Sequence, residues 1–154
     1  MHPNCKESNY QDSVKKYLLS TFAERNTPIV FDRTLRNPDT LNNSIDEWVS
    51  VIYGSMIYGA TTMPVLYIYC CTRGDAEQYR LVRLTDFTRS LFLDSSMPDG
   101  IKRIPVYNFD TEEQEQIGFV LPRDIASGDT FDLNDQTKVR QLTIQLWYPT
   151  NGSL

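Results

Sequence analysis

The C-terminal stretch from Leu142 to Tyr148 alternates strictly between apolar and polar or amphipathic side chains. A period of two is typical of a β-strand that has one face on a core and the other toward solvent or a partner. We therefore expect one set of side chains to be buried: Leu142, Ile144 and Leu146. The other set points away from the core and consists of Thr143, Gln145 and Trp147. Trp147 is the largest of these outward side chains, which makes it a candidate interface residue.

Five other segments have the β-branched and aromatic composition of strands: 29–31, 48–53, 65–71, 101–109 and 117–121. A connection that contains Gly59 and Pro64 predicts a long hairpin between the second and third of them. The remaining stretches are rich in Asn, Asp, Ser, Thr or Gly, and they read as loops: 33–43, 110–116 and 127–135.

Two segments have the 3.6-residue spacing of an amphipathic helix, 12–25 and 75–93. The first has its apolar stripe at Val14, Tyr17, Leu18 and Phe22. The second has Leu81, Leu84, Thr88 and Leu91 on one stripe, flanked by Phe87. Asp75 is placed to cap the second helix at its N-terminus.

The order of elements is helix, strands, helix, strands, and most strands follow one another directly. This order predicts an α+β fold, a mostly antiparallel sheet with two main helices packed on one side. No internal repeat or linker divides the chain, so 1–154 is expected to be a single domain. At this length a fold buries about 70% of the surface of the unfolded chain, which is enough for one core.

The charge balance argues against tight binding of nucleic acid. Fifteen Lys and Arg stand against 20 Asp and Glu, a formal net charge of −5, whereas such binding normally requires clustered positive charge. The densest charged stretch is acidic, with Glu112, Glu113 and Glu115 in the segment 110–116. We expect this segment to project from the sheet, either toward a partner or lumen or as a solvated hairpin tip.

Three cysteines, Cys5, Cys70 and Cys71, do not describe a disulfide framework. Neighbouring residues of a strand point to opposite faces, so Cys70 and Cys71 are expected to be reduced and unpaired.

The longest apolar run is interrupted by Thr61, Thr62 and Pro64 and is too short to span a bilayer. No basic patch followed by an apolar segment opens the chain, so we expect synthesis in a cytoplasm without a signal peptide.

The sequence contains no recognisable set of catalytic residues. His2 is the only histidine, which excludes the nucleophile systems that need an imidazole base and nearly every common zinc arrangement. A calcium loop starting at Asp129 would need Gly at its sixth position and Glu at its twelfth, but Asn134 and Arg140 stand there. We therefore expect no catalytic, cofactor-binding or metal-binding residues, although a carboxylate-pair enzyme stays an alternative.

The layout resembles the tail terminator proteins of long-tailed bacteriophages over most of the chain. An amphipathic helix leads into an extended apolar segment, and a central aromatic strand follows a polar loop. An apolar strand then ends in an Arg-containing turn before a Leu-spaced helix, and a last strand closes the sheet. The segments that carry the likeness are 17–32, 47–51, 68–91 and 140–148.

This resemblance implies a structural virion protein and no enzyme. Members of the family form a ring, usually a hexamer, that caps the tail tube and receives the head–tail connector. The implied partners are other copies of the chain, the tail tube protein and the connector, while DNA passes through the ring without being held tightly. The implied location is the tail or neck of a virion that is assembled in the host cytoplasm. Other neck and tail-completion proteins share this size and style, and they remain an alternative. Glu112, Glu113, Glu115 and Trp147 are the candidate interface or lumen residues.

Overall fold

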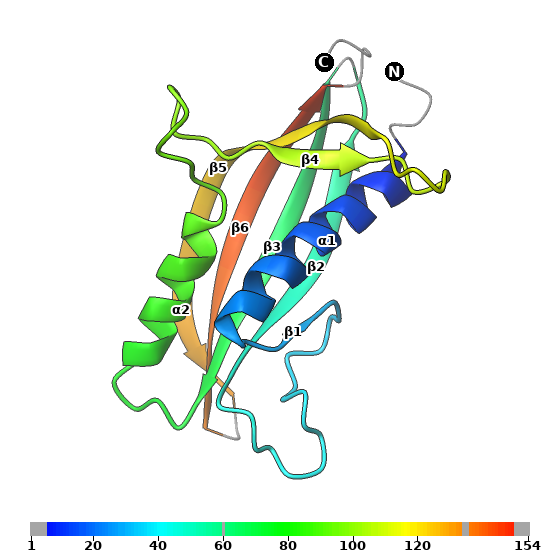
Figure 1. Cartoon of the computed structure of the whole chain (residues 1–154). Coiled ribbons are helices and arrows are strands. Elements are labelled where there is room, and N and C mark those ends of the chain that lie inside the picture. The colour runs from blue at the N-terminus through cyan, green and yellow to red at the C-terminus, as the bar shows by residue number, and fades with distance from the viewer. Residues whose placement is uncertain (1–5, 60, 134–135, 150–154) are drawn as a thin grey trace.

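The computed structural model describes residues 6–59, 61–133 and 136–149, and Figure 1 shows their arrangement. The elements in chain order are α1 (Glu7–Arg25), β1 (Ile29–Val30), β2 (Glu47–Ile57), β3 (Thr61–Arg73), α2 (Tyr79–Ser90), β4 (Ile104–Tyr107), β5 (Gln116–Asp132) and β6 (Thr137–Pro149). One six-stranded sheet has the strand order β1-β2-β3-β6-β5-β4.

The predicted fold class is confirmed. Every strand pair is antiparallel except the short parallel pair of β1 with β2. The sheet curls into a half-barrel, and α1 and α2 lie on the same side of it (Figure 1). The predicted hairpin between 48–53 and 65–71 is the β2–β3 pair.

The first helix is longer than the predicted segment 12–25, because it begins at Glu7. Its buried stripe contains Tyr10, Val14, Leu18 and Phe22, which are spaced by four residues and share one helix face. Asn26 ends the helix with a left-handed backbone, φ 60°, a conformation in which asparagine is well tolerated.

Strand β4, at one edge of the sheet, packs against α1 (Figure 1). The hydroxyl oxygen of Ser13 accepts a hydrogen bond from the backbone N–H of Tyr107 at 2.9 Å. The side-chain oxygen of Asn9 accepts one from the backbone N–H of Phe109 at 3.1 Å. Both polar side chains are buried, so these bonds satisfy groups that would otherwise be costly to enclose.

The second helix is shorter than the predicted segment 75–93. Asp75 lies before the helix, and its carboxylate accepts hydrogen bonds from the backbone N–H groups of Arg80 and Leu81. The hydroxyl of Thr72 donates a third bond to it. Asp75 therefore satisfies the first turn of α2, as a capping residue does, from outside the helix.

The predicted loop at 127–135 is wrong for most of its length. Strand β5 continues through Ser127, Gly128 and Asp129 and ends at Asp132. Polar residues can stay in this strand because its far end is exposed on both faces and pairs with β6 through the backbone. The positions Asn134 and Asp135 of that predicted loop lie outside the described residues.

The alternation predicted for the C-terminal strand is confirmed. Leu142, Ile144 and Leu146 are fully buried in the main core between the sheet and the helices. The residues between them lie on the other sheet face.

Cys70 and Cys71 lie on opposite sides of the sheet, as expected for neighbours in a strand. Cys70 belongs to the main core, and Cys71 to a second cluster with Trp48 and Val139. The loop that precedes β2 supplies Leu35 and Ile45 to this second cluster. The loop thus covers only one end of the outer sheet face, the face turned away from the helices.

Candidate assembly surface

The acidic segment 110–116 forms the tip between β4 and β5, and all residues from 111 to 116 are exposed. A backbone hydrogen bond from Asn108 N–H to the Glu115 carbonyl closes the tip at 2.8 Å. Its base is joined to the start of α1 by an ion pair between Lys6 and Asp110 at 2.7 Å. Within the described part of the chain, Glu112, Glu113 and Glu115 form no ion pair.

Trp147 lies on the outer sheet face, and 38% of its surface is exposed. The strand register places Leu121 of β5 directly opposite it. Phe119, two residues earlier on β5, is also exposed. Neither helix covers this end of the sheet from outside, so these side chains form an apolar patch in contact with water.

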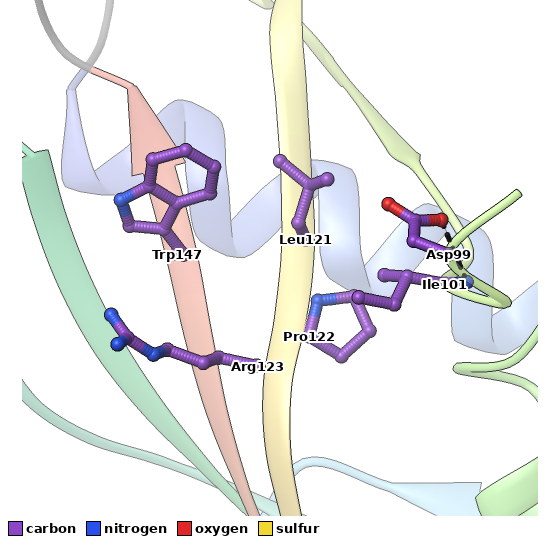
Figure 2. A pocket seen from close by; sticks show the side chains of 6 residues that line it. All are labelled: Asp99, Ile101, Leu121, Pro122, Arg123 and Trp147. Carbon is purple, nitrogen blue, oxygen red and sulfur yellow. Dashed lines mark hydrogen bonds between the residues drawn. The ribbon is translucent and has the colours of Figure 1, made fainter.

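A hollow of about 330 Å³ lies beside Trp147 (Figure 2). Its lining combines β6, β5 and the connection between α2 and β4, through Trp147, Leu121, Pro122, Arg123, Ile101 and Asp99. Most of this lining is apolar, and two charged side chains stand at its rim (Figure 2).

A β-bulge places Arg123 at this hollow. Leu121 and Pro122 pair with Trp147 and Leu146, but the next paired residue is Asp124, so Arg123 is the extra residue of the bulge. A bulge redirects a side chain and interrupts regular pairing. Proline has no N–H to donate, and it is tolerated at such a position because the interrupted pairing does not require a donor there.

The two charged residues of the hollow, Asp99 and Arg123, differ in whether an opposite charge compensates them. The carboxylate of Asp99 is bound by Arg103 at 3.0 Å and by the backbone N–H of Ile101 at 3.1 Å. The hydrogen bond from Arg103 is the main cause that lowers the pKa of Asp99, so this acid stays ionised and its charge is compensated. Arg123 is exposed and forms no ion pair with any residue that the structure describes. The hollow therefore offers a partner apolar surface and one uncompensated cation.

A second hollow of about 400 Å³ continues along the same side of β5. It shares three residues with the first, Ile101, Pro122 and Arg123. Leu93 and Ile125 extend its apolar lining, and Leu93 is more than half exposed. Together the two hollows form a groove along β5, which we call the β5 groove.

The structure does not join the predicted candidate residues into one site. Glu112, Glu113 and Glu115 lie at the β4–β5 tip, whereas Trp147 lies on the outer sheet face and lines a hollow to which none of them contributes. Sequence reasoning missed Arg123 and Pro122, although a Pro-Arg pair inside an otherwise apolar strand signals a bulge. It also missed Ile101 and Asp99, for which no local signal exists.

The Cys70 thiol is buried in the main core. Burial raises the pKa of the Cys70 thiol to about 11, so it is a protonated core residue rather than a nucleophile. Among the described residues, no three His, Cys, Asp or Glu side chains gather as metal ligands would. No helix in that part of the chain has the length and apolar character needed to cross a membrane.

Comparisons with known proteins establish the fold alone. No known protein family matches the sequence, and no curated protein matches it. One solved structure, of a protein designated only by a sequence identifier, superposes with a TM-score of 0.62. The match covers 95% of this chain and 97% of the other at 8% sequence identity.

Proposed function

We propose that this protein is a structural component of a bacteriophage tail, a tail terminator that assembles into a ring on the end of the tail tube. The ring would receive the head–tail connector, and it would belong to a virion assembled in the host cytoplasm. The resemblance of the sequence layout to that family is the starting point of the proposal.

The observation that supports the proposal best is the uncovered apolar surface at Trp147 with the β5 groove beside it. Exposed aromatic and aliphatic side chains beside a shallow hollow are typical of a surface that is buried against another protein. Arg123 and Asp124 line this groove without an ion pair to any described residue, and both are exposed to solvent, as charged residues at the polar rim of an interface are. These features favour assembly over catalysis.

The acidic net charge of the chain also supports this proposal. A net charge of −5 with three exposed glutamates at the β4–β5 tip suits a channel through which DNA slides without being gripped. In this proposal the tip faces the lumen of the ring or a neighbouring subunit.

Electron microscopy of the purified protein, alone and mixed with isolated tail tubes, tests the proposal. Rings on the connector-facing end of the tubes are expected. Binding to head connectors without binding to tubes would instead identify another neck component and would contradict the terminator assignment. A protein that stays monomeric and leaves both particles bare would overturn the proposal altogether.

A further inference from the structure

We infer that subunits of this protein join edge to edge, with the free edge of β5 in one copy pairing with the free edge of β2 in the next. This inference rests on the proposed ring, since it names the contact that would close it. Both strands are largely unpaired on one side in the described structure. An unpaired strand edge presents backbone N–H and C=O groups that another strand can satisfy.

On one flank, β4 covers only the start of β5. Its last pair is Ile104 with Val120, so no described strand pairs with β5 on that side from Leu121 onward, although Ile101 and Leu93 line the groove beside it. On the opposite flank, β1 covers only Val49 and Ser50 of β2. The segment 51–57 is therefore also open.

The open segment of β2 lies at the height of 121–127, the first part of the open segment of β5. Ser127 is level with Val51, because the ladder runs from Ser127 through Leu142 and Ile68 to Val51. At the other limit, Leu121 pairs with Trp147. The next residue, Tyr148, pairs with Thr62, so Trp147 lies opposite Met63. Since Met63 pairs with Ile57, Leu121 is level with Ile57. We call 121–127 the β5 window and 51–57 the β2 window.

The polarity of the strands suits such a contact. Three antiparallel steps separate β2 from β5, through β3 and β6, so the two strands run in opposite directions. In a ring all subunits have the same orientation about the axis. The β5 window of one copy would therefore meet the β2 window of the next in antiparallel orientation and at equal height. Backbone pairing would join 125–127 to 51–53, which lie clear of the bulge at Arg123 in β5 and of the bulge at Gly54 in β2.

Ring geometry favours this contact over pairing of β5 with itself. Two β5 edges that pair with each other form a closed two-fold dimer, which cannot continue around a ring. The β2 window contains no charged residue that would repel Arg123 or Asp124 of the β5 window. Pairing of unlike edges can continue from copy to copy, and it closes into a ring where the rotation allows.

Side chains fit the same arrangement. The β5 groove beside the β5 window is lined by Leu93, Ile101 and Ile125. The β2 window contributes Ile52, Met56 and Ile57, of which Ile57 is more than half exposed. Docking one window on the other would remove apolar surface of both copies from water.

Site-specific disulfide cross-linking tests the contact, between two variants that each have one added cysteine beside the buried Cys70 and Cys71. Ala126 and Ile52 stand at the same height, because Ala126 pairs with Thr143, Thr143 with Tyr67, and Tyr67 with Ile52. In a background with Cys5→Ser, one variant has Ala126→Cys and the other, with a size tag, has Ile52→Cys. Mild oxidation of the mixture should give the mixed dimer in large excess over either homodimer.

Ser95→Cys is the matched control for Ala126→Cys, because Ser95 is also exposed but lies outside the sheet, in the connection between α2 and β4. It should give no mixed dimer with Ile52→Cys. A chain with both Ala126→Cys and Ile52→Cys should give a ladder of covalent oligomers that ends at the ring size. Homodimers of Ala126→Cys would overturn the inference, because they would mean that β5 pairs with itself.

Native mass spectrometry and electron microscopy of the same unoxidised samples separate the two proposals. Rings in an unoxidised sample whose oxidised counterpart gives no mixed disulfide would overturn the edge contact and leave the ring itself standing. A monomer in every sample, with or without tail tubes, would overturn both.

Discussion

Gly54 lies directly against the ring of Tyr67 on the neighbouring strand. A Cβ atom at position 54 would come within 2.7 Å of Tyr67 Cε2 and 3.0 Å of the carbonyl oxygen of Val65. Gly54 belongs to a bulge of β2, because Tyr53 pairs with Leu66 and the next pair is Met56 with Pro64. The bulge thus brings the backbone of β2 close to the tyrosine ring, within the β2 window.

Gly54→Ala should therefore destabilise the fold by about 1–3 kcal/mol, the usual effect of overpacking. Chemical denaturation measures it. Gly128→Ala is the control, because its Cβ would only make an ordinary contact, 3.6 Å from the Gln141 carbonyl. If Gly54→Ala is as stable as the wild type, the close approach is not a constraint. The same substitution in a Tyr67→Ala background should lose part of its effect.

Ile144→Asp should unfold the protein. Ile144 is fully buried in the middle of the apolar stripe of β6, and an unpaired buried charge destabilises by several kcal/mol, about 3 or more. Thr143→Asp, one residue earlier on the outer face, should leave the protein folded. Circular dichroism and thermal melting compare the two variants. A folded, soluble Ile144→Asp protein would contradict the register of β6.

Trp147→Ala should weaken assembly by about 2 kcal/mol or more while the melting temperature of the monomer changes little. The reason is that Trp147 is partly exposed on the outer face and lines a hollow instead of the main core. Sedimentation measures the association, and calorimetry the melting. The neighbouring residue provides the control, since Tyr148 is buried and Tyr148→Ala should lower stability by about 3–5 kcal/mol. A Trp147→Ala protein that melts and assembles normally would remove this residue from the interface.

Reversal of the charges at Glu112, Glu113 and Glu115 should leave the melting temperature unchanged. All three are exposed, and exposed charges contribute little to stability. If the tip faces the lumen or a subunit contact, particles that contain the triple Lys variant should show defective assembly or DNA passage. The triple Gln variant, which removes the charges without reversing them, should be less affected. Normal particles from the Lys variant would leave the segment as a solvated hairpin tip.

Asp75 should link the stability of α2 to pH. Burial opposes its ionisation, but the hydrogen bonds from Leu81, Arg80 and Thr72 outweigh this effect and lower the pKa of Asp75. A lowered pKa in the folded state means a contribution that is fully present above the unfolded pKa of about 3.9 and is lost as the pH falls below it.

Asp75→Ala should therefore be less stable than the wild type by about 1–2 kcal/mol at neutral pH. The difference should shrink as the pH falls below about 4. Urea denaturation at neutral and at acid pH measures both values. A difference that stays constant down to strongly acid pH would show that the carboxylate charge is not what stabilises the start of α2.

The sequence by itself determined the fold class, because local periodicity reports which face of each element is apolar. The alternation around Ile144 and the four-residue spacing of Val14, Leu18 and Phe22 are both local patterns, and the structure confirms both. The same information placed Trp147 on the outer sheet face. Each of these conclusions needs only neighbours within a few positions of the chain.

Only the tertiary structure decided how far the strands extend and what lies beside Trp147. The polar end of β5 reads as a loop locally, but β6 supplies backbone partners as far as Asp132, and backbone pairing does not depend on side-chain type. Arg123, Ile101 and Asp99 meet near Trp147 because a bulge and a long connection bring them there. The equal height of the β2 and β5 windows follows from the registers of three strand pairs, which no single segment of sequence encodes.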